Sequence, residues 1–144
     1  MKFLASIALL AGATQAFKWK DVHQPGDGDV SRREGSYYVI EWDPEGSEGT
    51  FELQMRSFNN TPTIIPGPTP SSFPTYDYHW QTTVLNPSVK YSDKHYTWLV
   101  TPLNGRAGDE FTYRVSGQTA AGESLPYARP WELIPNGYVC KVVQ

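Results

Sequence analysis

The sequence has 144 residues, of which 39% are hydrophobic and 14% aromatic, and its formal net charge is -3. This mild acidity, without any cluster of Lys and Arg, argues against nucleic acid as a partner, because phosphates require a basic surface. Only one long apolar stretch occurs, at the N-terminus, so no membrane span is predicted.

The first sixteen residues, MKFLASIALLAGATQA, are typical of a secretory signal peptide. Lys2 supplies a positive start, the apolar run is too short to span a bilayer, and Thr14 and Ala16 place small residues before a cleavage site. A buried N-terminal helix is disfavoured, because no polar face interrupts the run. We therefore predict a secreted protein whose mature chain, 17–144, forms a single domain with its own core.

The first half of the mature chain predicts three strands. A short strand is expected around 18–22, and SYYVIEW (36–42) is β-branched and aromatic. TFELQMRSF (50–58) alternates strictly, which indicates a strand with one buried and one solvated face. The inward-facing residues are expected to be Tyr38, Ile40, Trp42, Phe51, Leu53 and Met55.

Residues 59–80 contain five prolines and cannot continue a central strand, because proline lacks the amide hydrogen. We expect a long exposed loop here, and long loops are usually functional or disordered. NNT at its start is a glycosylation acceptor, so Asn59 is a candidate for an N-glycan, although Pro62 lowers the efficiency of modification.

The second half predicts a strand around 81–85, two aromatic-rich strands with a Gly-containing connection, an irregular stretch at 125–137 and a final strand, YVCKVV. The aromatic-rich strands are expected to turn Tyr96, Trp98, Val100, Phe111, Tyr113 and Val115 inward. Cys140, the single cysteine, shares a face with Tyr138 and Val142, which favours a small buried side chain over a reactive or intermolecular thiol. No segment has a sustained helical period. The fold class is therefore predicted to be all-β, a two-sheet sandwich of immunoglobulin or fibronectin type III shape.

Two stretches resemble a known family. EGSYYVIEWDPEGSEGTFELQMRSF is similar to the Gly…Tyr-x-Ile-x-Trp…Gly-Thr-x-x-Leu-x-Leu part of the N-terminal domain of the fungal cell-wall-synthesis, killer-toxin-resistance (Kre/Knh-like) family. HYTWLVTPLNGRAGDEFTYRVSG is similar to its later Tyr-Thr-Trp-x-Val-Pro…Gly…Tyr-x-Ile/Val part. The resemblance covers about 35–117, and the matching positions are Tyr38, Ile40, Trp42, Gly49, Thr50, Leu53, Tyr96, Thr97, Trp98, Val100, Leu103 and Tyr113.

This resemblance implies a secreted fungal protein with an immunoglobulin-like domain, linked to the cell wall and to β-glucan, and it brings no catalytic residues. Family members often continue into a Ser/Thr-rich stretch and a lipid-anchor signal. The present sequence reaches Gln144 with neither, and its proline-rich loop replaces a shorter connection. Free secretion is therefore expected over retention on the wall.

Catalytic and metal chemistry have weak support in the sequence. The three histidines, His23, His79 and His95, have no metal-binding spacing. Asp21, His23, Asp27 and Asp29 lie close together in the sequence, and oxygen ligands this dense are suited to calcium, but the full loop spacing is missing and a solvated acidic loop is favoured. The paired-carboxylate candidates Asp43, Glu45, Glu48, Asp109 and Glu110 lie in expected turns, and no Gly-x-Ser-x-Gly motif occurs. We expect no enzyme activity, no metal and no cofactor.

The aromatic cluster FPTYDYHW lies in the expected loop. Phe73, Tyr76, Tyr78 and Trp80 can stack on the apolar faces of sugar rings, while Asp77 and the Tyr hydroxyls bond sugar hydroxyls. The alternative is that the loop folds back and its rings cover the edge of the core.

The leading hypothesis is a non-catalytic wall-associated protein that binds or organises β-glucan. The second is a secreted effector or interaction module that meets another extracellular protein and binds no glycan. The third is an enzyme whose site leaves no mark in the sequence.

Overall fold

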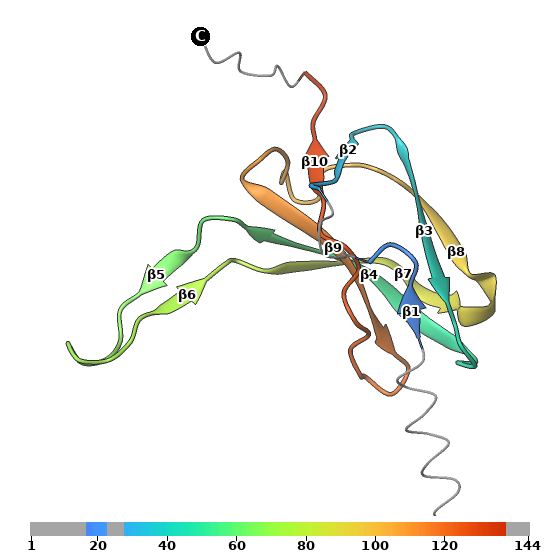
Figure 1. Cartoon of the computed structure of the whole chain (residues 1–144), viewed down its shortest axis with the longest axis horizontal. Coiled ribbons are helices and arrows are strands. Elements are labelled where there is room, and N and C mark those ends of the chain that lie inside the picture. The colour runs from blue at the N-terminus through green and yellow to red at the C-terminus, as the bar shows by residue number, and fades with distance from the viewer. Residues whose placement is uncertain (1–16, 23–27, 138–144) are drawn as a thin grey trace, which may run out of the picture.

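The computed structural model describes residues 17–22 and 28–137 (Figure 1). The predicted signal peptide, His23 and Asp27 of the acidic loop, and the final strand with Cys140 lie outside the described residues and stay predictions. The described part is all-β, as predicted, with ten strands and one short 3-10 helix. It contains no helix of the length and apolar character needed to cross a membrane.

One sheet has the strand order β1-β3-β8 and is antiparallel throughout. Its strands are β1 (Lys18–Trp19), β3 (Tyr37–Asp43) and β8 (His95–Leu99). Exposed and buried residues alternate along the whole of β3, which confirms the predicted inward face. Strict alternation of this kind places one face on the core and the other in water.

The second sheet has the order β7-β4-β9, with β4 (Thr50–Asn59) between the edge strand β7 (Gln81–Lys90) and β9 (Phe111–Thr119). The pairing of β4 with β7 shifts register between Phe51 and Gln54. At this position β7 contains Pro87, and an edge strand tolerates proline because one row of its amides faces away from the sheet.

The core lies between these two sheets and is rich in aromatic rings. Trp42 is fully buried, with its ring centroid 5.2 Å from that of Phe51 on the opposite sheet. Its Nε1 donates to the carbonyl of Tyr91, 2.9 Å away, in the 3-10 helix η1 (Tyr91–Asp93). Phe17 and Trp19 complete this cluster through edge-to-face contacts. The core predicted from alternation is thus confirmed for Trp42 and Phe51.

Two of the predicted inward residues are only half-buried. Phe111 begins β9 opposite Asn59, at the end of the sheet where fewer side chains cover it. Tyr96 packs against the core, and its hydroxyl donates to the carbonyl of Leu85 in β7 of the opposite sheet, at 3.4 Å. Tyr113, by contrast, is completely buried. Its hydroxyl donates to the carbonyl of Arg106 and accepts from the amide of Leu103, 3.1 Å away, which fixes the connection before β9.

The proline-rich segment is more ordered than the sequence predicts. It contains β5 (Thr63–Ile65) and β6 (Thr75–Asp77), which pair with each other and project from the ends of β4 and β7 (Figure 1). The prolines exclude a central strand but permit these short edges. We call residues 60–79 the arm.

The stretch at 125–137, expected to be irregular, contains β10 (Glu132–Ile134), which runs parallel to β2 (Ser31–Arg33). Just before β10, this stretch follows β9: Ala128 donates to the carbonyl of Val115, and Trp131 exchanges hydrogen bonds with Tyr113. It therefore borders the second sheet on the side away from β7.

Candidate functional site

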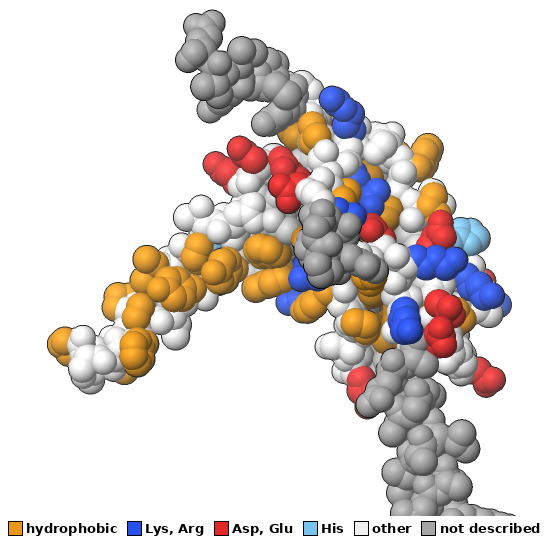
Figure 2. Space-filling model, viewed as in Figure 1, with side chains coloured by type: hydrophobic (Ala, Val, Ile, Leu, Met, Phe, Trp, Pro, Cys, Tyr) orange, Lys and Arg blue, Asp and Glu red, His pale blue; other side chains and the backbone are white. Residues whose placement is uncertain are grey.

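The arm carries exposed apolar side chains and no charge over most of its length. Ile64 is 62% exposed and Phe73 is 92% exposed. Figure 2 shows hydrophobic side chains gathered along the arm and towards its junction with the body. Residues 57–76 contain no Asp, Glu, Lys, Arg or His. A contiguous exposed apolar surface of this kind is typical of an interaction site.

A polar joint sets the direction of the arm where it meets the body. His79 has a left-handed backbone, with φ of 54°, and its amide donates to Asp77 Oδ1 at 2.8 Å. The His79 ring places Nδ1 3.3 Å from Asp77 Oδ2 and Nε2 2.7 Å from Thr63 Oγ1. Both carboxylate oxygens of Asp77 thus contact His79, one at its amide and the other at its ring. The main role of this carboxylate is therefore to hold His79 in place at the joint.

Carboxylate, imidazole and hydroxyl follow one another in this joint in the order of a hydrolase triad. The Asp77 and His79 side chains are, however, 48% and 44% exposed, whereas the carboxylate of such a triad is buried to orient the histidine. The geometry therefore fits a surface joint better than an activated nucleophile.

A cluster of rings lies where the arm meets the outer face of the second sheet, and we call it the root face. It consists of Arg56, Phe58, Tyr78, Trp80, Arg114 and Tyr127. Phe58 lies 4.6 Å from Trp80 and 6.2 Å from Tyr78 between ring centroids. Trp80 lies 6.1 Å from Tyr127 with an interplanar angle of 23°. Tyr78, Trp80 and Tyr127 are 39%, 42% and 40% exposed, so water and ligands reach all three rings.

Strand geometry explains how these residues meet. In β4 the inward residues are buried, and the alternating partners Arg56 and Phe58 stand on the outer face. Trp80 directly precedes β7, and Tyr127 comes from the stretch that follows β9. The root face is therefore assembled from four separate chain segments.

Two arginines lie against the rings. The Arg56 guanidinium is 4.6 Å from the Trp80 ring centroid and 5.3 Å from that of Tyr127, and its Nη1 donates to the Tyr127 hydroxyl. The Arg114 guanidinium is 5.1 Å from the Tyr127 centroid, and its Nε donates to the carbonyl of Ala128 at 2.9 Å. Burial lowers the pKa of the Arg114 guanidinium. The rings hold both cations in place through cation–π contacts.

The five glycan-binding candidates from the sequence thus divide into three groups. Phe73 and Tyr76 lie on the exposed arm, Asp77 belongs to the joint, and Tyr78 and Trp80 belong to the root face. The root face also contains four residues that were not predicted from the sequence: Arg56, Phe58, Arg114 and Tyr127. Alternation in β4 already pointed Arg56 outward, but nothing local indicated that Tyr127 would lie beside it.

Asn59, the predicted glycosylation residue, is half-buried at the end of β4 beside the arm. Its amide donates to the carbonyl of Tyr78 at 2.8 Å, and its Oδ1 accepts from the amide of Thr61 at 3.2 Å. A glycan on Asn59 would stand next to the root face, and its presence stays a prediction.

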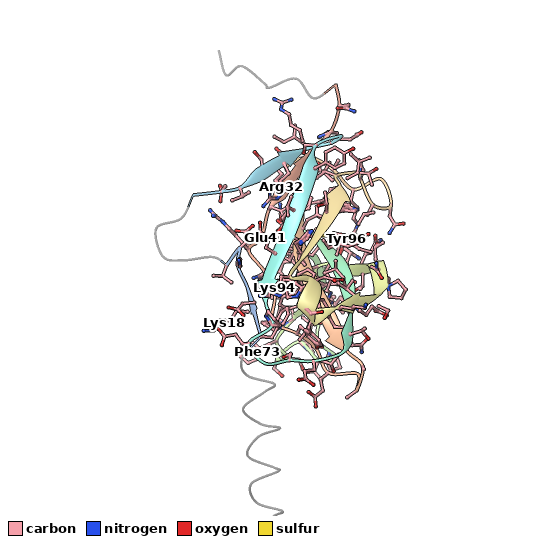
Figure 3. All side chains as sticks on the ribbon, turned by 90° about the vertical axis from the view of Figure 1, so that its right-hand side faces the viewer. Lys18, Arg32, Glu41, Phe73, Lys94 and Tyr96 are labelled. Atoms are coloured by element: carbon pink, nitrogen blue, oxygen red, sulfur yellow. The ribbon has the colours of Figure 1, made fainter. Side chains whose placement is uncertain are left out.

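A second polar cluster lies at Tyr38, on the inward face of β3 and near the predicted acidic loop. Arg32, labelled in Figure 3, donates from Nη2 to Asp21 Oδ2 at 2.9 Å, and its guanidinium lies 3.6 Å from the Tyr38 ring centroid. Burial raises the pKa of Tyr38 to about 12. The carboxylate of Asp21 is therefore paired with an arginine, and the described residues contain no group of three or more potential metal ligands.

Comparison of the chain with protein-family models, curated proteins and solved structures gives no match. The root face is accordingly interpreted from its own chemistry. Half-exposed rings stack on flat apolar surfaces such as those of sugar rings, and guanidiniums pair with carboxylates and phosphates.

Proposed function

We propose that the protein is a secreted, non-catalytic module that binds cell-wall polysaccharide of the β-glucan class through the root face and the arm. The observation that carries this proposal is the set of three half-exposed rings, Tyr78, Trp80 and Tyr127, beside a segment free of charge. Rings in this arrangement fit a chain of sugars, which presents flat apolar faces and hydroxyl groups.

We further propose that the sandwich is of the immunoglobulin or fibronectin type III kind. The hydroxyl of Tyr113, near the start of β9, bonds the carbonyl of Arg106 seven residues upstream, as in the tyrosine corner of such domains. The arm is then an extension of the hairpin that joins the two neighbouring strands β4 and β7.

The resemblance to the Kre/Knh-like family supports the proposed type of sandwich more directly than it supports the proposed ligand. Most of the matching positions are core residues, among them Tyr38, Trp42, Leu53 and Tyr113. None of the root-face residues belongs to the matching set. Wall association and β-glucan as ligand therefore need a binding measurement.

The test is a pull-down of the mature chain with insoluble β-glucan. The double variant Tyr78→Ala/Trp80→Ala removes two rings of the root face, and we expect at least a tenfold weaker binding. Tyr37→Ala is the matched control, because Tyr37 is 73% exposed on the outer face of the other sheet. Equal binding by the wild type and a folded double variant would contradict the proposal, and release of soluble sugars would contradict its non-catalytic part.

A second candidate function is recognition of another extracellular protein by the arm. Ile64 and Phe73 are strongly exposed on the arm and do not belong to the root face. Among the described strands, β5 and β6 pair only with each other. Free strand edges add strands from partners. The variant Ile64→Ser/Phe73→Ser separates the functions: glucan binding that survives it, with loss of a co-purifying secreted protein, favours the second.

A further inference from the structure

The root face contains a pair of like charges at the least favourable place in a sheet. Arg56 of β4 is the direct cross-strand partner of Arg114 of β9. Side chains directly opposite in an antiparallel pair stand about 5 Å apart at Cβ, and like charges there destabilise the sheet. The pairing is unexpected in a protein whose net charge is negative.

No carboxylate compensates this pair in the part of the chain that the structure describes. The contacts between basic and acidic side chains found there join Lys20 to Glu41, Arg32 to Asp21 and His79 to Asp77, and involve neither Arg56 nor Arg114. Glu52, the acid on the same face of β4, accepts from Gln54 Nε2 at 2.7 Å. It stands four residues from Arg56, about 13 Å along an extended strand. The partner of Arg56 in β7 is Thr82, which is neutral.

Several N–H donors of Arg56 and Arg114 have no hydrogen-bond partner among the described residues. Arg56 uses Nη1 on the Tyr127 hydroxyl, and its buried Nε has no hydrogen-bond partner. Arg114 uses Nε on the carbonyl of Ala128. Arg56 Nη2 and both terminal nitrogens of Arg114 have no hydrogen bond among the described residues. Guanidiniums present their donors as a planar fork that matches two oxygens of a carboxylate or phosphate.

We propose that Arg56 and Arg114 form an anion-binding subsite, and that the ligand of the root face is a saccharide carrying an acidic group. The sugar ring stacks on Trp80 or Tyr127 while its oxyanion pairs with the two guanidiniums. This proposal rests on the proposed polysaccharide binding at the root face and changes the expected ligand: an acidic saccharide is bound in preference to a neutral β-glucan. Two sources share the required chemistry, a uronic acid carboxylate and a sugar phosphate.

The experiment is a calorimetric titration of the mature chain with four probes: oligogalacturonate, mannose 6-phosphate, a neutral β-glucan oligosaccharide and inorganic phosphate. We expect at least one acidic sugar to bind ten times more tightly than the neutral one. Arg114→Gln and Arg56→Gln are expected to remove that preference. Arg114→Lys keeps the charge but loses the fork, so an intermediate affinity is expected. Lys90→Gln, an exposed charge at the other end of β7, is the matched control and leaves affinity within twofold.

The outcomes separate this inference from the proposed function. Equal affinity for acidic and neutral sugars, unchanged in Arg114→Gln, overturns the anion subsite and leaves polysaccharide binding in place. No binding of any sugar overturns both. Inorganic phosphate bound as tightly as the acidic sugars overturns the saccharide assignment. The melting temperature without ligand shows whether Arg114→Gln is folded, since this exchange removes the bond to the Ala128 carbonyl together with one of the like charges. A folded Arg114→Gln that keeps the preference for acidic sugars overturns the subsite.

Discussion

Gly117 offers a sharp test of how tightly β4 and β9 pack. It lies opposite Leu53 in the β4–β9 pair, in the buried part of β9. A Cβ at this position would lie 2.8 Å from Leu125 Cδ1 and 3.0 Å from the backbone oxygen of Glu52. Gly117→Ala therefore inserts one methyl group into a site with no room for it.

Two opposing effects decide how much Gly117→Ala changes the free energy of unfolding. Overpacking a core by a methyl-sized group costs about 1–3 kcal/mol. Replacing glycine by alanine in a strand returns about 0.5–1 kcal/mol, because the unfolded chain loses freedom. The Leu125 methyl can rotate away, but the Glu52 carbonyl is part of the strand backbone and moves only with β4. We expect a net destabilisation of about 1 kcal/mol, or a melting temperature lower by about 4 °C for a domain of this size.

Urea unfolding followed by circular dichroism measures this difference. Gly28→Ala is the matched control, because a Cβ there meets no atom within 4 Å and the backbone does not require a positive φ. The same exchange is expected to stabilise the protein at Gly28 by about 0.5 kcal/mol. If Gly117→Ala proves as stable as wild type, β9 does not lie as close to Glu52 and Leu125 as the structure places it.

Two further predictions concern the core. Trp42→Phe removes the donor to Tyr91 and leaves a cavity, while the Tyr91 carbonyl keeps the weaker bond from Lys94, so we expect a loss of about 2 kcal/mol in urea unfolding. Trp80→Phe, at a half-exposed position, should cost less than about 1 kcal/mol, and equal losses would contradict the buried placement of Trp42. Burial raises the pKa of Tyr38 from 10.0 to about 12. As the pH rises, Tyr38 therefore loses its phenol proton in the unfolded chain before it does so in the folded protein. The contribution of the neutral phenol to the free energy of unfolding is fully present below pH 10 and falls by about 1.4 kcal/mol per pH unit between pH 10 and 12. Tyr38→Phe should show a shallower fall of unfolding free energy from pH 9 to 11.5, and an unchanged slope would refute the shift.

Local patterns in the sequence were enough to predict the all-β class and the faces of the main strands. Alternation in 36–42 and 50–58 identified Ile40, Trp42 and Leu53 as core residues, and all three are buried. This works because the side-chain period of a strand is local: each residue's face follows from its neighbours two positions away. The same rule pointed Arg56 outward without indicating what it would meet.

Which strands lie side by side could not be read from such local patterns. β8 and β9 follow one another in the chain, yet β8 pairs with β3 and β9 with β4, so their inward residues reach the core from opposite sheets. Strand pairing depends on contacts between distant segments, which no short window of sequence contains. The root face depends on the same non-local choice: Arg56 meets Tyr127 across 71 positions, and faces Arg114 only because β4 pairs with β9.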